Sequence, residues 1–184
     1  RFLTQGDPEP SSRVVSGYKR RHSTHIPEGA KIPYARGSLE TMPRTLMQKT
    51  LILLKPDAIQ GGFCGKVITR FEEAGFKIIG CKMVQLTPNI LREHYAHLLD
   101  KPFYGAIEKF MSSTPVIAMV LEGENVIDRA REMLGATDSR KAAEGTIRRE
   151  LGRDTMVNVA HASDSAETAF REIRRFFKGT GTFF

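Results

Sequence analysis

The 184-residue chain is poor in cysteine and has no long apolar run. Its two cysteines, Cys64 and Cys81, are too few for a disulfide framework and lack zinc-site spacing, so a reducing compartment is the default expectation. We expect both to be small apolar core residues. No apolar stretch approaches the roughly 18 residues of a membrane-spanning helix. These absences indicate a soluble globular domain with one core.

A phosphate-binding loop of the Walker type is also absent. The glycine-rich segment 61–66 lies between an expected strand and an expected helix, where such a loop would be found. However, Gln60 occupies the position of the first glycine, and Val67 replaces the hydroxyl residue that binds magnesium. We therefore do not expect a nucleotide to be held by this segment.

Residues 1–46 have no periodic apolar pattern. They contain five of the nine prolines, and eight Lys or Arg against four Asp or Glu. Such a segment cannot supply a core, so we divide the chain into a basic extension, 1–46, and a domain, 47–184. The extension has the composition of a mitochondrial leader, of an anchor to a larger assembly, or of a vector-derived tail. Its basic run Lys19-Arg20-Arg21 is either a solvated cluster or a contact for an acidic partner.

From residue 46 onward, strand-like and helix-like patterns alternate. This alternation predicts an α/β (α+β) sandwich with helices packed on one face of a four-stranded sheet. The expected strands are 51–54, 77–86, 115–121 and 156–159, and the expected helices are 65–74, 88–95, 104–111, 125–134 and 165–177.

His161 is the strongest candidate for a nucleophile. It lies in the segment Asn158–Ser165, NVAHASDS, between an expected strand and an expected amphipathic helix. A free imidazole has a pKa of about 6.5, so its neutral form is abundant at pH 7 and can accept a phosphoryl group. Ser163 and Glu172 follow closely enough to form a hydroxyl and carboxylate pair beside the ring. The alternative is a surface histidine at a helix cap.

Three cations elsewhere in the chain match this chemistry. Lys55 follows the apolar run 51–54 at a proline, Arg131 lies near the end of a helical segment, and Arg148 closes the sequence GTIR. Together with the hydroxyl of Thr137, these groups can neutralise a polyphosphate while a histidine attacks its terminal phosphorus.

In these motifs the chain resembles the nucleoside diphosphate kinases. The matching segments are TLILLKPDAIQ (50–60), EHYAHLLDKPFY (93–104), REMLGATDS (131–139), GTIR (145–148) and NVAHASDS (158–165), and the resemblance extends over about 48–177. It implies a ferredoxin-like fold with an antiparallel sheet. It also implies that the long segment 135–155 forms one wall of the site and contributes to oligomer contacts.

The resemblance assigns roles to individual residues. It makes His161 the phosphohistidine, with Tyr95, Ser163 and Glu172 ordering the histidine and the incoming phosphate. The remaining assignments concern the nucleotide: phosphate contacts at Lys55, Arg131, Thr137 and Arg148, ribose contacts at Lys55 and Asn158, and base stacking on Phe103.

The expected reaction is a ping-pong transfer of the γ-phosphate from a nucleoside triphosphate to a nucleoside diphosphate. Mg2+ carried by the phosphates is the expected cofactor. Because His94 and His97 show no evident third ligand, we expect no metal held directly by the protein. The base is expected to stack on Phe103, and no side chain is evident that would hydrogen-bond to the edge of the base. This predicts little base specificity.

The partners implied by the resemblance are nucleoside di- and triphosphates and further copies of the chain, in a tetramer or a hexamer. The expected location is cytoplasmic, or mitochondrial if 1–46 is a native leader. Two other functions stay open at this point. One is an assembly subunit anchored by 1–46, and the other is a nucleic-acid-binding module, which the net charge of +7 would suit.

Overall fold

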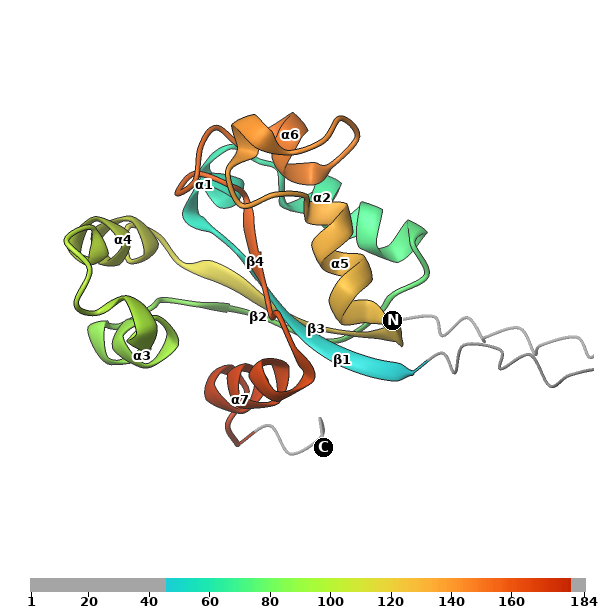
Figure 1. The fold of residues 1–184 in the computed structure, drawn as a ribbon. Coiled ribbons are helices and arrows are strands. Elements are labelled where there is room, and N and C mark those ends of the chain that lie inside the picture. The colour runs from blue at the N-terminus through green and yellow to red at the C-terminus, as the bar shows by residue number, and fades with distance from the viewer. Residues whose placement is uncertain (1–45, 180–184) are drawn as a thin grey trace, which may run out of the picture. The chain divides into compact units, whose positions relative to one another are not determined.

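Four antiparallel strands form the central sheet of the domain. The computed structural model describes residues 46–179. Strand β1 (Met47–Leu54) pairs with β3 (Val116–Glu124) on one side and with β4 (Ala160–Ala162) on the other, and β2 (Lys77–Val84) pairs with β3. The resulting order is β2-β3-β1-β4 (Figure 1). The antiparallel, ferredoxin-like sheet that the family resemblance implies is confirmed.

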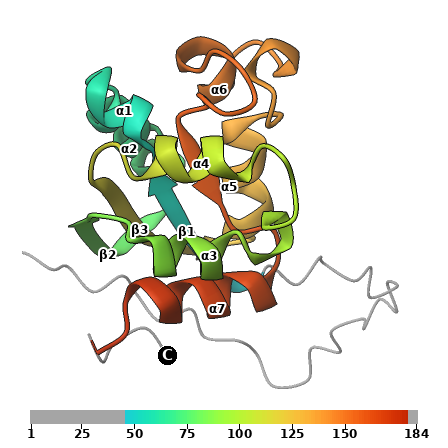
Figure 2. The same ribbon diagram turned by 90° about the vertical axis from the view of Figure 1, so that its left-hand side faces the viewer.

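Helices cover both faces of this sheet. Helices α3 (Pro88–His94), α4 (Tyr104–Met111) and α7 (Ala166–Phe176) lie together in front of one face in Figure 2. Helices α2 (Cys64–Glu73) and α5 (Val126–Leu134) pack on the other face. The prediction of helices on one face is therefore wrong.

The apolar run in β1 explains why both faces are covered. Successive side chains of a strand point to opposite faces. Leu51 and Leu53 consequently enter the core beneath α3, α4 and α7, whereas Ile52 and Leu54 enter the core beneath α2 and α5. All four are fully buried, and an uninterrupted apolar strand of this kind needs cover on each side.

Helix-capping residues set the beginnings of two helices that carry site residues. Thr87 accepts a hydrogen bond from the backbone of Ile90 at the start of α3, where Pro88 occupies the first turn. Ser165 accepts one from the backbone of Thr168 at the start of α7. These caps fix where α3 begins after β2 and where α7 begins after β4.

Several expected boundaries need correction. The strand expected over 156–159 is not formed. Strand β4 begins at Ala160, directly after the expected end, so His161 lies within a strand rather than in a turn. Pro56 ends β1 as expected but also begins a short unpredicted helix, α1 (Pro56–Gln60). The segment 135–155 contains two short helices, η2 (Ser139–Lys141) and α6 (Ile147–Leu151), and η1 (Ala96–Leu98) follows α3.

Only one of the two cysteines contacts the core, so the expectation for Cys81 is wrong. Cys81 is exposed on β2, whereas Cys64, at the start of α2, is partly buried and packs against the core beneath α2 and α5. Strand β2 lies at the edge of the sheet. Within 46–179, no helix has the length and apolar character needed to cross a membrane. The proposed extension, apart from Leu46, lies outside the described residues.

Candidate active site

A cleft of about 990 Å³ opens between the ends of the central strands and the helices of one face. Ser163 lies buried beside it. The other predicted site residues all line it: Lys55, Tyr95, Phe103, Arg131, Thr137, Arg148, Asn158, His161 and Glu172. The sequence motifs, which are spread over more than a hundred residues, thus meet in one cavity.

Strand pairing places His161 beside the end of β1. In the antiparallel register His161 lies opposite Leu53, two residues before Lys55. Ser163 follows two positions after His161 and therefore projects to the same side of the chain. The Ser163 hydroxyl accepts a hydrogen bond from the backbone of Leu51 at 3.3 Å. The β1–β4 pairing thus holds the imidazole and the hydroxyl side by side.

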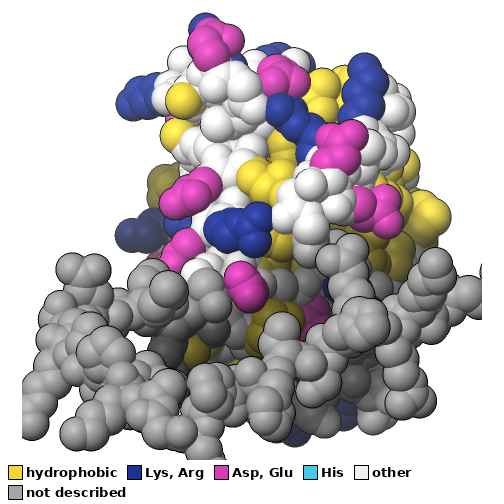
Figure 3. Space-filling model, turned by 90° about the vertical axis from the view of Figure 1, so that its right-hand side faces the viewer, with side chains coloured by type: hydrophobic (Ala, Val, Ile, Leu, Met, Phe, Trp, Pro, Cys, Tyr) yellow, Lys and Arg dark blue, Asp and Glu magenta, His cyan; other side chains and the backbone are white. Residues whose placement is uncertain are grey.

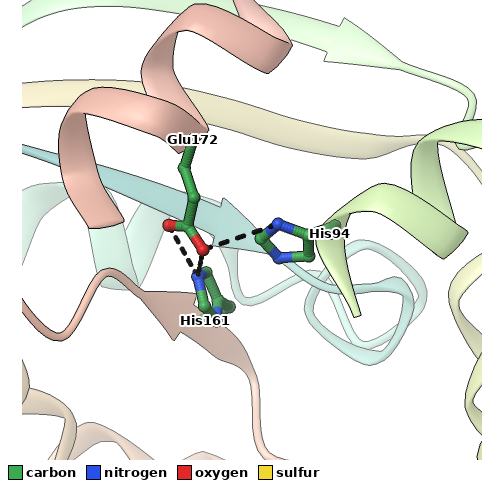
Figure 4. A group of neighbouring side chains, drawn as sticks. All are labelled: His94, His161 and Glu172. Atoms are coloured by element: carbon green, nitrogen blue, oxygen red, sulfur yellow. Dashed lines mark hydrogen bonds and ion pairs between the residues drawn. The ribbon is translucent and has the colours of Figure 1, made fainter. Parts of the chain in front are cut away.

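Glu172 connects these two side chains, and Figure 4 shows its contact with His161. Both of its carboxylate oxygens lie 3.0 Å from Nε2 of His161. Ser163 Oγ donates a hydrogen bond to Oε2 at 2.6 Å. Burial alone would raise the pKa of Glu172, but the hydrogen bond from His161 and the further contacts lower it to about 2. The carboxylate is therefore ionised at neutral pH and acts only as an acceptor.

This contact decides the tautomer of His161. Because an ionised carboxylate has no proton to donate, Nε2 must carry the hydrogen of the contact. In a neutral imidazole the other nitrogen then holds the free lone pair. Since the side chain of His161 is 27% exposed and lines the cleft, its Nδ1 is the nitrogen available to a substrate.

The hydroxyl of Tyr95 is a further group on the cleft wall. Tyr95 follows α3 directly and its ring packs edge-on against His94. Burial and the negative charge of Glu172 raise its pKa above the usual value. The phenol stays protonated at neutral pH and can donate a hydrogen bond.

Lys55 brings a buried ammonium group to the end of β1. Its Nζ donates to Oδ1 of Asn158 at 2.7 Å and to the carbonyl of Met156. Burial lowers the pKa of Lys55 to about 8, and Arg148 adds to this effect, whereas Asp57 opposes it. The charge of Lys55 is thus only partly compensated by the protein, and a polyphosphate in the cleft would stabilise it.

Arg148 is oriented by three backbone carbonyls. Its guanidinium donates to Gly135 at 2.8 Å, to Ala160 at 2.7 Å and to Asn158 at 3.3 Å. Burial, followed by the nearby charge of Arg131, lowers its pKa to about 10. Two cations that face the same cleft and repel each other create a site that favours a multiply charged anion.

The turn before β4 explains why the expected strand is absent. Val159 has a φ of 73°, which a β-branched residue rarely adopts. The carboxylate of Asp57 accepts its backbone N–H at 2.8 Å, and the backbone N–H of Lys55 donates to its carbonyl at 2.9 Å. Asn158 donates from Nδ2 to the carbonyls of Thr137 and Thr155. Long-range partners therefore override the strand propensity of this segment.

Phe103 and Thr137 occupy the outer part of the cleft. Phe103 precedes α4 and is 50% exposed, so it is not a core residue and presents its ring to the cavity. Thr137 is exposed in the loop after α5, and its carbonyl is tied to Asn158. An exposed aromatic at the mouth and cations in the interior suit a ligand with a flat ring and an anionic tail.

Some cleft residues were not expected from the motifs. His94 is buried and its ring contacts that of His161 at a centroid distance of 4.6 Å. Burial, together with His161, lowers its pKa to about 3. Arg171 and Arg175 also line the cleft from α7, with Arg175 bonded to Glu93 at 3.3 Å. The i, i+3, i+4 spacing of 168, 171, 172 and 175 was a signal that these residues share the helix face of Glu172.

Comparison with known proteins agrees with this geometry. The family model for nucleoside diphosphate kinase matches residues 48–181. A nucleoside diphosphate kinase of Bacillus cereus is 48% identical over 132 residues, which are 72% of this chain and 89% of the relative. A mitochondrial nucleoside diphosphate kinase of Columba livia is 46% identical over 150 residues, or 82% of this chain and 83% of the relative.

A solved structure resembles the fold as well. The nucleoside diphosphate kinase of Halobacterium salinarum, in complex with CDP, superposes with a TM-score of 0.71 at 39% identity, covering 73% of this chain and 90% of that chain. Matches in sequence, in fold and in the residues gathered around His161 lead to one conclusion: the chain belongs to the nucleoside diphosphate kinase family.

Proposed function

We propose that His161 carries the phosphoryl group in the reaction of this family, the transfer of a γ-phosphate from a nucleoside triphosphate to a nucleoside diphosphate. The observation that supports this role is the contact between Glu172 and Nε2 of His161, with both carboxylate oxygens at 3.0 Å. It leaves the lone pair of Nδ1 facing the cleft.

In the first half-reaction, Nδ1 of His161 attacks the γ-phosphorus. A bond forms between nitrogen and phosphorus, the bond to the β–γ bridging oxygen breaks, and the diphosphate leaves. The imidazole becomes more positive as the new bond forms, and ionised Glu172 stabilises this charge through the N–H of Nε2. In the second half-reaction, an oxygen of an acceptor diphosphate attacks the phosphohistidine by the reverse path, so one site serves both halves.

The cations of the cleft take the charge of the phosphates. We assign Lys55, Arg131 and Arg148 to this task, with the hydroxyl of Thr137 as a further donor. Arg148 has five N–H donors and uses three of its donor atoms on carbonyls, so it is positioned before substrate arrives. Such preorganisation avoids reorganisation during the transfer.

The nucleoside would occupy the outer cleft. Phe103 offers an exposed ring for stacking on the base. Asn158 uses both Nδ2 hydrogens on carbonyls and accepts from Lys55 at Oδ1. One lone pair of that oxygen stays available for a ribose hydroxyl. Stacking and ribose contacts do not distinguish bases, which supports low base specificity.

Mg2+ fits this site as an ion carried by the substrate. Among residues 46–179, the one group of clustered metal-binding side chains is His94, His161 and Glu172, which lacks the oxygen-rich set that Mg2+ prefers. The phosphates themselves supply such oxygens. When bound, Mg2+ would add positive charge across the phosphates. Lys55, Arg131 and Arg148 would neutralise the remaining negative charge.

The position of the phosphoryl group on the ring tests the proposed role of His161. We expect the protein, treated with ATP and Mg2+ without acceptor, to carry phosphate on Nδ1, because Nε2 is occupied by its contact with Glu172. Phosphorus and proton NMR of the phosphoprotein distinguish the two isomers. Phosphate on Nε2 would contradict the assignment of Glu172. A Glu172→Gln variant serves as the control. Its amide can donate a hydrogen bond to Nε2, so the proton of His161 is no longer fixed on that nitrogen.

Of the two other functions left open by the sequence, the nucleic-acid-binding module is not favoured by the comparisons. The coloured surface in Figure 3 also mixes Lys and Arg with Asp and Glu side chains. Arg70, for example, pairs with Glu150 at 3.0 Å, and Arg149 with Glu144 at 2.8 Å. A nucleic-acid footprint is instead a patch of positive charge.

We further propose that the chain acts as a homo-oligomer, a tetramer or a hexamer, as the family resemblance implies. Its proposed location is the cytoplasm, or mitochondria where 1–46 is a native leader. The alignment with the Columba livia relative, which is named mitochondrial, supports the second location because it spans 150 residues of this chain, more than the 134 residues from 48 to 181 that the family model matches.

We propose that residues 1–46 are dispensable for catalysis. They contain none of the site residues, whereas β1 begins at Met47 and is buried from Thr50 onward. A protein that begins at Met47 is expected to keep its turnover and its thermal stability. Loss of phosphotransfer on truncation would show that the extension belongs to the site or to an obligatory oligomer contact. A matched full-length protein with Lys19, Arg20 and Arg21 replaced by alanine separates an anchoring role from a catalytic one.

A further inference from the structure

His94, His161 and Glu172 come from three different elements and meet in the cleft (Figure 4). One nitrogen of each histidine and one carboxylate oxygen all lie within 4.8 Å of one another. Nε2 of His161 is 3.0 Å from the carboxylate of Glu172, and Nδ1 of His94 is 3.5 Å from its Oε1. Of its three residues, His94 and Glu172 are buried and His161 is partly exposed.

His94 is the part of this cluster that the phosphotransfer does not use. Its side chain is 1% exposed, and neither ring nitrogen has a hydrogen-bond partner within the described residues. The separation of 3.5 Å from Glu172 is too long for a good hydrogen bond. Leaving both nitrogens of a buried imidazole unpaired costs free energy, so an additional ligand between His94 and Glu172 would compensate it.

Two imidazoles and a carboxylate form a donor set for zinc. Zn2+ binds nitrogen at about 2.0–2.1 Å in tetrahedral sites, which places neighbouring donor atoms about 3.3 Å apart. The two distances to Glu172, 3.0 and 3.5 Å, already bracket this spacing. Mg2+ prefers oxygen ligands and does not suit the set. The open cleft beside His161 leaves room for water as the fourth ligand.

We propose that the nucleotide-free enzyme binds one Zn2+ ion between His94, His161 and Glu172, and that the ion blocks phosphorylation of His161. A neutral imidazole carries a single ring proton. When zinc binds the lone pair of Nε2, this proton moves from Nε2 to Nδ1. The lone pair needed to attack the γ-phosphorus is lost.

The inhibition rests on the proposed function of His161, whereas the binding of the metal does not. Zinc needs the lone pair of Nε2, whereas attack by Nδ1 needs the tautomer that carries its proton on Nε2, so zinc binding competes with phosphorylation of the free ring. Zinc is therefore expected to act on the free enzyme. This would couple the first half-reaction to the availability of free zinc.

Zinc binding is tested on the nucleotide-free full chain by competition with a chromogenic chelator. We expect one site per chain, and binding weaker by about tenfold or more in His94→Phe, which keeps a ring in the buried position without nitrogen donors. His97→Phe is the matched control, because His97 is exposed in the same cleft, and it should bind zinc as the unchanged protein does. Equal affinity in both variants would overturn the site.

Two further measurements distinguish loss of the zinc ligand from misfolding of His94→Phe. Thermal unfolding of His94→Phe shows whether its structure is intact, and His94→Cys, which restores a zinc ligand, should recover the affinity. Crystals soaked in Zn2+ and measured at the zinc absorption edge should show an anomalous peak between the three side chains of the unchanged protein. A peak at His97 or elsewhere on the surface would contradict the proposal.

The inhibitory step is tested by phosphorylation with ATP and Mg2+ at buffered free zinc. We expect zinc to suppress the label on the unchanged protein and on His97→Phe, and to leave the ratio with and without zinc near one in His94→Phe. Because all proteins meet the same nucleotide complexes, zinc displacing Mg2+ from ATP would affect them equally and would overturn the inhibition. Absence of label even without zinc would instead refute the proposed role of His161 and leave the binding result standing.

Discussion

Replacing His161 with alanine is expected to abolish the phosphoenzyme and to lower turnover by at least about 10³-fold, because the variant loses the atom that forms the bond to phosphorus. The unchanged protein, given labelled ATP and Mg2+ without acceptor, should acquire an acid-labile and base-stable label. His161 is partly exposed on β4, so its replacement leaves the buried cores in place.

His97→Ala is the matched control for this experiment, since it removes an exposed histidine from the same cleft. It should be labelled as strongly as the unchanged protein. Equal labelling of His161→Ala would show that another residue carries the phosphate and would refute the proposed mechanism. Each preparation also needs a nucleotide-binding measurement, and absence of label from both His97→Ala and the unchanged protein, in material that binds nucleotide, would likewise refute the proposed role of His161.

Replacing either Lys55 or Arg131 with alanine is expected to lower kcat/KM by roughly 30-fold to 1,000-fold. This corresponds to about 2 to 4 kcal/mol of transition-state stabilisation from a charge-assisted hydrogen bond to the transferring phosphoryl group. Lys66→Ala is the control, because it removes an exposed cation of α2 that does not line the cleft. A loss below about threefold for Lys55 or Arg131 would mean that the wrong cations are assigned.

The two cations can be told apart by pH. Lys55 has a pKa lowered to about 8 by burial, so its charge is present below this value and is lost as pH rises through it. The kcat/KM of the unchanged protein, which reports groups of the free enzyme, should therefore decline above about pH 8. This decline should be absent in Lys55→Ala and retained in Arg131→Ala. Thermal unfolding is measured in parallel, because Lys55 also holds the turn at Asn158.

The elements that local pattern predicts well are those with strong periodicity. Helix α7 repeats buried residues at Ala169, Ile173 and Phe176, and this spacing alone marks its inner face. The run 51–54 is apolar without alternation, which indicates a strand buried on both faces. The prediction of helices on one face overlooked this second property of the run, although the residues themselves contained it.

The segment 156–159 shows where local pattern fails. Its apolar residues favour a strand, yet Val159 adopts a positive φ because Asp57, 102 residues away in sequence, accepts its N–H. The position of His94 was equally hidden. In the sequence its neighbour in a possible metal pair is His97, whereas in the fold it faces Glu172 and His161. Contacts between distant segments have no signature in a short window of sequence.

The sequence by itself determined the family of this protein, and its motifs contain the residues proposed for the chemistry: a histidine as nucleophile, cations for a polyphosphate and an aromatic for a base. Only the tertiary structure decided which nitrogen of His161 is free, and so which atom we propose to react. The pairing of β4 with β1 and the packing of α7 bring Glu172 to Nε2 of His161, and an ionised acceptor at one nitrogen leaves the lone pair at the other. A tautomer depends on atomic contacts, and residue types and their spacing do not specify such contacts.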